Sequence, residues 1–206
     1  MDIHKKIKKW EKNDGPKLMR ELGIKTDSII IDMGCGFGHY SIAIQNILGK
    51  NGKVIAIDKD QRILSMFKDR NELSDNIEYF KGKLEDIENS IYEDADFILL
   101  YDILHGASPD RFQLFEKLRK IVKPNCIISI LPFHLSNFRD REGKKKKYSY
   151  NKIINEMNEM GFTLDNKISK GIHFEKYHSP HIMSKGTLNF EDLEVGDILN
   201  FILSGN

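Results

Sequence analysis

A short run of residues near the amino terminus, together with an acid farther along, has the types and spacing of a nucleotide-type site. Gly34, Gly36 and Gly38 come after an apolar run that ends in Asp32, and Asp58 ends a second apolar run 20 residues beyond Gly38. Glycines allow a tight turn and let a ligand approach the backbone closely. An acid at that distance, on the second strand of a βαβ unit, can accept hydrogen bonds from ribose hydroxyls. We therefore predict a cofactor site at the carboxyl ends of two neighbouring strands.

The elements that must hold this site follow from the hydrophobic pattern. Short, nearly continuous apolar runs predict buried strands, and amphipathic runs between them predict helices. We expect strands at 29–31, 53–57, 77–80, 95–101, 126–131 and 162–168, and helices at 40–48, 60–73, 108–121 and 149–160. Strands that alternate with helices in this way predict a doubly wound α/β fold, with a parallel sheet and right-handed crossovers.

Length and composition limit the classes of protein that fit. The chain has 206 residues, with 32 basic and 31 acidic side chains and a net charge of +1. One domain fits this length, and a nearly neutral charge creates no field that would attract nucleic acid or an anionic membrane. The two cysteines, Cys35 and Cys126, have no companions at metal-ligand spacing and fit reduced thiols. With no signal peptide and no apolar run long enough to cross a bilayer, we expect a soluble, cytoplasmic protein.

The first dozen residues predict a short basic helix. Ile3, Ile7 and Trp10 fall at helical spacing among lysines, and a second helix is expected at 17–22. Three roles fit the first helix: it packs on the domain through its apolar stripe, forms a lid over a substrate pocket, or lies on a membrane surface.

The carboxyl-terminal third is the least regular part of the pattern. The polar loop at 132–148 is either solvated or covers a substrate, and a seventh strand is expected at 197–203, with 172–177 as the alternative. We expect a single domain over 1–206, divided into N-terminal helices or a lid at 1–24, a cofactor-binding core at 25–132, and a substrate-side loop with C-terminal strands at 133–206.

With these elements in place, the sequence resembles the class I S-adenosylmethionine-dependent methyltransferases. The resemblance rests on the stretch 32–38, Asp58, the loop at Gly82, Tyr101-Asp102 after the fourth strand, and 118–124 before the fifth. The spacing Gly-x-Gly-x-Gly, in place of Gly-x-Gly-x-x-Gly, also argues against a dinucleotide. The resemblance implies a three-layer Rossmann-like sandwich with a seven-stranded, mostly parallel sheet whose last strand is antiparallel, inserted between the fifth and sixth. It also implies S-adenosyl-L-methionine as cofactor and S-adenosyl-L-homocysteine as product.

The resemblance implies roles for individual residues as well. The Gly-rich turn would face the methionine part of the cofactor, Asp58 would hold both ribose hydroxyls, and Lys59 with Lys83-Leu84 would border the adenine. The implied cofactor-binding residues are Asp32, Gly34, Cys35, Gly36, Gly38, Tyr40, Asp58, Lys59, Lys83, Leu84 and Tyr101. The family often has an aspartate at the position of Lys83, so Glu85 or Asp86 is the alternative partner of the adenine amino group.

Methyl transfer from a sulfonium requires alignment of the reactants more than activation, so we expect a pocket over the first, fourth and fifth strands. An acceptor that carries a proton also needs a base. The catalytic candidates are His105, Tyr101, Asp102 and His134, each with a pocket-lining or structural role as the alternative. His39 is expected to cap the helix after the turn or to line the cleft. His173, His178 and His181 lie within nine residues, but they match no metal-ligand spacing, and we expect no metal.

These observations predict methyl transfer to a small-molecule acceptor. The alternatives are methylation of RNA, for which the lysines in 5–9 and 144–147 would form a basic strip, methylation of protein, and a non-catalytic cofactor-binding scaffold. Nucleic acid is disfavoured as a partner by the balanced charge, and no membrane partner is expected.

Overall fold

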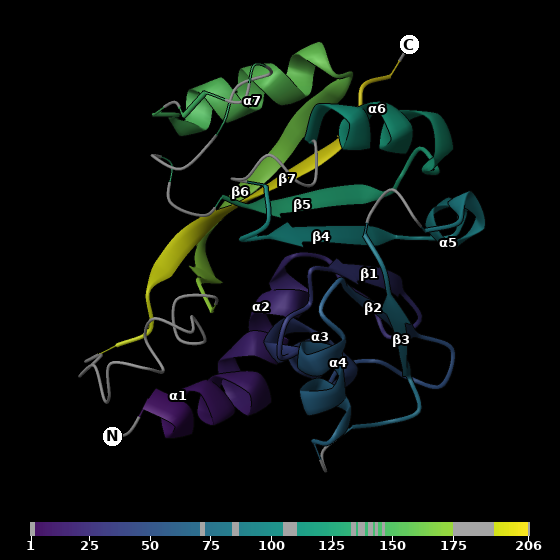
Figure 1. Ribbon diagram of the computed structural model, residues 1–206, viewed down its shortest axis with the longest axis vertical. Helices are drawn as coiled ribbons and strands as arrows, with labels where there is room; N and C mark the ends of the chain where they lie inside the picture. Colours follow the sequence, from purple (N-terminus) through teal and green to yellow (C-terminus); the bar gives the residue numbers. More distant parts are fainter. Residues whose placement is uncertain are drawn as a thin grey trace.

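A computed structural model describes residues 3–70, 73–83, 87–104, 111–132, 135, 139, 142, 144–145, 147–174 and 192–205. Its strands form one seven-stranded sheet in the order β3-β2-β1-β4-β5-β7-β6 (Figure 1). They are β1 (Ile29–Met33), β2 (Lys53–Asp58), β3 (Ile77–Lys81), β4 (Phe97–Tyr101), β5 (Ile127–Leu131), β6 (Phe162–Ile172) and β7 (Val195–Leu203). β7 is antiparallel to β5 and β6, whereas the other neighbouring strands are parallel. The predicted sheet is confirmed, including the seventh strand at 197–203.

Helices cover both faces of the sheet and complete the three layers (Figure 1). On one face lie α1 (Ile3–Lys9), η1 (Trp10–Asp14), α2 (Gly15–Glu21), α3 (His39–Gln45) and α4 (Gln61–Lys68); on the other lie α5 (Asn89–Glu93), α6 (Arg111–Ile121) and α7 (Tyr150–Glu159). Successive residues of a strand face opposite sides, so Ile30 joins one apolar core while Ile31 and Met33 join the other. The central strands are therefore mostly apolar, with Asp32 in β1 and Ser129 in β5 as buried polar exceptions.

Local capping sets several helix boundaries. The Asp60 side chain accepts a hydrogen bond from the Arg62 N–H at 2.9 Å and starts α4, and Ser149 caps α7 in the same way. α4 ends at Lys68, earlier than the predicted 73, and β6 continues to Ile172, beyond the predicted 168. The proposed cap of α6 at 108–109 lies outside the described residues.

The amino-terminal helices pack on the domain. Ile7 and Trp10 are buried, as the first of the three predicted roles requires. At η1 the helix widens to a π-helix, and the Gly15 N–H donates to the Trp10 carbonyl. A Cβ on Gly15 would lie 2.8 Å from the Cβ of Ala43, so glycine is needed for the close approach of this segment to α3. Within the described residues, no helix combines the length and the apolar character that a membrane span requires.

Candidate cofactor and acceptor site

The Gly-rich turn joins β1 to α3 at the carboxyl edge of the sheet. The Gly34 N–H donates to the Ile57 carbonyl of β2 at 2.8 Å, which fixes the start of the turn. A Cβ on Gly34 would lie 2.5 Å from Ile103, and one on Gly38 would lie 2.1 Å from the Phe67 ring. Both glycines also have positive φ, of +68° and +75°. The neighbouring elements therefore exclude larger residues at these two positions.

Gly36 differs from its two neighbours because it faces open space. It has φ +53°, and a Cβ there would meet nothing within 4 Å. Its N–H donates to Oδ2 of Asp58 at 3.0 Å, and Oδ1 of Asp58 accepts from the Asp60 N–H at 2.9 Å. Each carboxylate oxygen has a further lone pair, so Asp58 can accept two hydroxyl hydrogens without giving up these bonds. Open space beside a bare backbone and a half-buried carboxylate fits a ligand that carries a ribose diol.

Asp32 and Cys35 lie beside this space. Asp32 is 4% exposed, and its Oδ2 accepts a hydrogen bond from the Ser41 hydroxyl of α3 at 2.6 Å. Burial, with a smaller contribution from the charge of Asp58, raises the pKa of Asp32 to about 6. Burial and the charges of Asp32 and Asp58 raise the pKa of the Cys35 thiol well above its usual value. The site thus combines a carboxylate that is ionised at neutral pH with a thiol that keeps its proton.

Tyr40 and Tyr101 form an aromatic wall between the turn and β4. Their ring centroids are 4.5 Å apart. The Tyr40 hydroxyl donates to the carbonyl of Ile172 at 3.0 Å and accepts from its N–H at 2.7 Å, while the Tyr101 hydroxyl lies 2.8 Å from Oγ of Ser129. Burial raises the pKa of both phenols well above the usual value. Of the roles predicted for Tyr101, this geometry favours lining the site over proton transfer.

Asp102 follows β4 and pairs with a histidine from the other end of the chain. Oδ1 of Asp102 lies 2.6 Å from Nδ1 of His173, and each residue is 8% exposed. Asp102 has φ +58°, the only positive φ outside glycine in the described part of the chain. The His173 ring crosses over β7, where a Cβ on Gly196 would lie 2.2 Å from Nε2. A carboxylate can only accept, so Nδ1 of His173 carries the hydrogen of this contact.

Sequence reasoning singled out Asp102 but did not connect it to His173, because the two are 71 residues apart and share no local pattern. The suggested metal cluster is described only at His173, since His178 and His181 lie outside the described residues. Within the described residues, no three histidine, cysteine or acidic side chains are grouped as a metal site would need.

The remaining predicted residues are described in part. Lys59 and Lys83 are exposed, just after β2 and β3. The other predicted positions lie outside the described residues: Leu84, Glu85, Asp86, His105 and His134. The adenine side of the site and two of the four catalytic candidates therefore stay as predictions.

His39, the first residue of α3, has a buried partner that sequence reasoning missed. The prediction that it caps α3 is wrong, because Gly38 is the N-cap and Nδ1 of His39 lies 2.5 Å from Oε1 of Glu11. Burial opposes ionisation of Glu11, yet hydrogen bonds from His39 and Arg70 outweigh it and hold the pKa of Glu11 below its usual value. Burial lowers the pKa of His39, so its ring is neutral at pH 7 and donates to the carboxylate.

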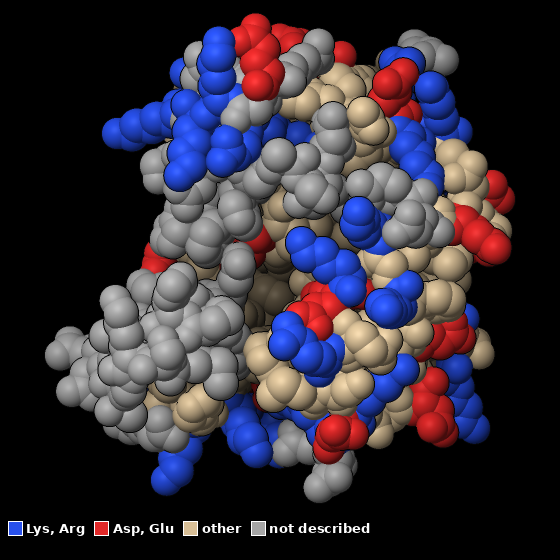
Figure 2. All heavy atoms as spheres, viewed as in Figure 1, with Lys and Arg blue, Asp and Glu red and all other residues tan. Residues whose placement is uncertain are grey.

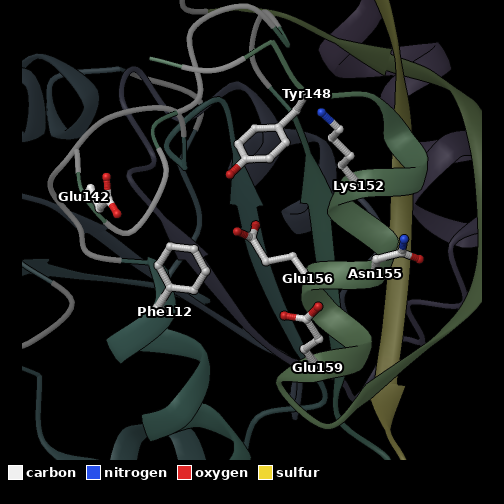
Figure 3. Close-up of a pocket in the computed structure, with 7 residues that line it drawn as sticks. All are labelled: Phe112, Glu142, Tyr148, Lys152, Asn155, Glu156 and Glu159. Carbon is white, nitrogen blue, oxygen red and sulfur yellow. The ribbon is translucent and has the colours of Figure 1, made fainter. Parts of the chain in front are cut away.

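A separate hollow of about 380 Å³ lies between α6 and α7 on the opposite face of the sheet from α3 (Figure 3). Its lining residues are Phe112, Glu142, Tyr148, Lys152, Asn155, Glu156 and Glu159. Arg111 supports this wall through two hydrogen bonds to Glu156, at 2.9 and 3.0 Å. The lining includes no residue of the turn, Asp58 or the Asp102–His173 pair, and we assign the hollow no part in methyl transfer.

Known proteins share both the sequence pattern and the fold. Residues 30–125 match the model of a family described as "Methyltransferase domain". Demethylmenaquinone methyltransferases of Staphylococcus saprophyticus and Staphylococcus aureus are 27% and 23% identical over 126 residues, 60% of this chain. These segments are 51% and 49% of the relatives, so the chain spans about half the length of the curated relatives it matches. The crystal structure of a SAM dependent methyltransferase from Aquifex aeolicus has a TM-score of 0.66 and 20% identity, with 97% of each chain covered.

The sheet order is that of a Rossmann-like fold, which the solved methyltransferase structure shares. Residues 30–125, which contain the Gly-rich turn and Asp58, are therefore similar to a methyltransferase domain in sequence as well as in fold.

Proposed function

We propose that the protein transfers a methyl group from S-adenosylmethionine to a small-molecule acceptor that must lose a proton. The observation that carries the proposal is the buried Asp102–His173 pair next to the cofactor turn. The relatives are demethylmenaquinone methyltransferases, and this name favours a small acceptor. Figure 2 shows basic and acidic side chains interspersed over the viewed face, around a hollow near its middle. This mixture, with a net charge of +1, favours a small acceptor over nucleic acid.

In this proposal the cofactor binds at the Gly-rich turn and at Asp58, the last residue of β2, and we call this site the cofactor seat. When bound, S-adenosylmethionine supplies an electrophilic methyl group on a sulfonium, with a neutral sulfide as leaving group. Gly36 admits the ligand to the backbone, Asp58 accepts from the ribose hydroxyls, and ionised Asp32 favours a cationic neighbour. Lys59 and Lys83 border the adenine side. Tyr40 and Tyr101 form the wall and exclude water from the seat.

The Asp102–His173 pair would take the proton of the acceptor. Asp102 accepts from Nδ1 of His173 and so fixes the ring and its tautomer, which makes Nε2 the basic nitrogen. We assign His173 as the general base and Asp102 as the residue that positions it. Ile103, the next residue, packs against Gly34, so the pair and the turn are held together. An acceptor with an ionisable O–H, N–H or C–H bond fits this chemistry.

The cofactor seat is tested by calorimetry with S-adenosylhomocysteine. Asp58→Ala should weaken binding roughly 100-fold, because it removes an ionised acceptor for two hydroxyls. Asp60→Ala is the matched control: it removes the cap of α4 but keeps the N–H that donates to Asp58. Unchanged affinity of Asp58→Ala, or an equal loss in Asp60→Ala, would contradict the seat.

The acceptor class is tested with a cofactor that carries an isotope-labelled methyl group. The purified protein is incubated with the low-mass, RNA and protein fractions of a cell extract. Label in the low-mass fraction supports the proposal, whereas label in RNA or protein contradicts it. Cofactor binding with no label in any fraction favours the scaffold alternative.

The base is tested by kinetics once an acceptor is labelled. His173→Gln should lower kcat roughly 100-fold or more, while the affinity for S-adenosylhomocysteine stays the same. Asp102→Asn should also lower kcat, since an amide can donate to Nδ1 and reverse the tautomer. A wild-type kcat in His173→Gln would rule out this role.

A further inference from the structure

A buried carboxylate in the amino-terminal segment is linked to the Gly-rich turn through two other side chains. Glu11 lies in η1, and its side chain is fully buried. Its Oε1 contacts Nδ1 of His39, and its Oε2 accepts from Nη2 of Arg70 at 2.8 Å. The proposed function gives this carboxylate no role. Burial of a carboxylate costs free energy unless the group is paired.

Arg70 continues the network into the turn. Its second terminal nitrogen, Nη1, donates to the carbonyl of Phe37 at 3.2 Å. Phe37 lies between Gly36 and Gly38, and His39 directly follows Gly38. Glu11 therefore holds the turn at two points, through Arg70 at Phe37 and through His39 at the first residue of α3.

The turn needs such support because its glycines do not fix their own conformation. Gly34, Gly36 and Gly38 all have positive φ, and glycine occupies positive and negative φ with similar ease. The start of the turn is bonded to Ile57 of β2. At its far side, the carbonyl of Phe37 is held by Arg70.

Glu11 is itself held rigidly. The backbone carbonyl of Glu11 accepts from Nδ2 of Asn46, at the end of α3, at 3.1 Å. The neighbouring Trp10 ring packs edge-on against Tyr40 and Phe174, with centroids 5.1 and 4.9 Å away. The amino-terminal segment is thus a fixed support from which the carboxylate projects to the turn.

We propose that Glu11 and Arg70 are positioning residues of the cofactor site, which fix the conformation of the Gly-rich turn and so raise cofactor affinity without touching the cofactor. This inference rests on the proposed cofactor seat. It extends that seat to two residues that lie 25 residues before and 34 residues after Gly36 in the sequence.

Arg70→Lys is the discriminating variant. Lysine keeps a positive charge beside Glu11, but a single ammonium lacks the planar fork that spans Glu11 and Phe37. Because a small misplacement of binding groups is costly, S-adenosylhomocysteine should bind Arg70→Lys roughly 10-fold more weakly. Glu11→Gln should weaken binding at least as much, since the hydrogen bonds of Arg70 and His39 to Glu11 both lose the charge of the carboxylate.

Glu156→Gln is the matched control, because it breaks another buried arginine–glutamate pair, with Arg111, on the opposite face of the sheet. It should lower thermal stability and leave cofactor affinity unchanged. Hydrogen exchange of the turn amides without cofactor gives a second measurement. The Gly38 N–H, bonded to the Cys35 carbonyl, should exchange faster in Arg70→Lys and not in Glu156→Gln.

Wild-type affinity and wild-type exchange in Arg70→Lys would overturn the inference, as would an equal loss of affinity in Glu156→Gln. If Glu11→Gln does not fold, Arg70→Lys decides. Absence of binding by the wild-type protein would overturn the cofactor seat together with this inference, whereas binding by the wild type and equally by both variants would overturn the inference alone.

Discussion

At Gly36, the effect of backbone conformation on stability can be measured separately from the effect of ligand access on binding. Gly36→Ala should cost about 1 kcal/mol of stability because of the positive φ, and its methyl group would enter the open space of the seat. We expect S-adenosylhomocysteine to bind this variant at least roughly 10-fold more weakly. Gly23→Ala is the control, since Gly23 has φ +96° and a Cβ there would meet only Phe97, at 3.8 Å. Urea denaturation and calorimetry of both variants check this, and equal affinities would contradict it.

Asp32 should make folding stability depend on pH. Its pKa is raised from 3.8 to about 6, so the folded protein holds this proton more tightly than the unfolded chain does. The contribution of Asp32 to stability is therefore greatest below about pH 4 and falls as pH rises to about 6, by about 3 kcal/mol in total. Asp32→Asn should lack this change. Denaturation of both proteins at about pH 4 and about pH 7 measures it, and a constant difference between them would show that the shift is absent.

At the scale of elements, the Asp102–His173 pair depends on how β4, β6 and β7 pack together. Gly196→Ala would place a methyl group 2.2 Å from Nε2 of His173 and 2.9 Å from Leu131. We expect the ring to leave Asp102 and kcat to fall roughly 10-fold or more, with cofactor affinity retained. In Gly205→Ala, where a Cβ meets nothing within 4 Å, kcat should not change. Full activity of Gly196→Ala would show that the pair does not serve catalysis.

The elements were predictable where one local pattern decides them. β1, β2 and β4 are buried on both faces, so their sequences are continuous apolar runs with clear ends. α5 was missed because five residues, of which only Tyr92 is buried, show no helical period. β6 extends to Ile172 because it pairs with β7. Its residues are mostly polar, so the hydrophobic pattern alone did not predict this extension.

The residues of the candidate site were likewise predictable only where a local pattern brings them together. The glycines and Asp58 lie within one βαβ unit, so their spacing alone predicts that they meet. Glu11 with Arg70, and Asp102 with His173, come together only through packing of distant segments. Nothing in the sequence distinguishes Glu11 from its many charged neighbours until its burial is known.

At the scale of the whole molecule, a chain of polar side chains crosses four neighbouring strands and is buried at Tyr101, Ser129 and Asn200, whereas its last member, Asn166, is exposed. Oγ of Ser129 donates to Oδ1 of Asn200 at 2.7 Å, and Nδ2 of Asn200 donates to Asn166 at 3.0 Å. A hydroxyl has one proton, so Ser129 must accept from Tyr101. The chain ties the cofactor-side strand β4 to the edge strand β6 through β5 and β7.

Ser129→Ala should destabilise the whole fold, since it leaves the Tyr101 hydroxyl and Oδ1 of Asn200 without this partner. We expect a loss of about 2 to 4 kcal/mol, measured by urea denaturation. Thr163→Ala removes another hydroxyl pair, the contact with Ser204 at 2.8 Å, but this pair is exposed and its loss should have little effect. Similar losses in the two variants would show that burial of the chain is not what makes it stabilising.

Cys35 shows how a reactive site can be protected from its own chemistry. A thiolate in the Gly-rich turn would be a strong nucleophile beside the electrophilic methyl group of the cofactor. Burial and the two carboxylates, Asp32 and Asp58, keep the sulfur protonated, and the neutral thiol is a poor nucleophile. If S-adenosylmethionine binds in the proposed seat, we expect the acids that favour its positive charge also to limit alkylation of Cys35.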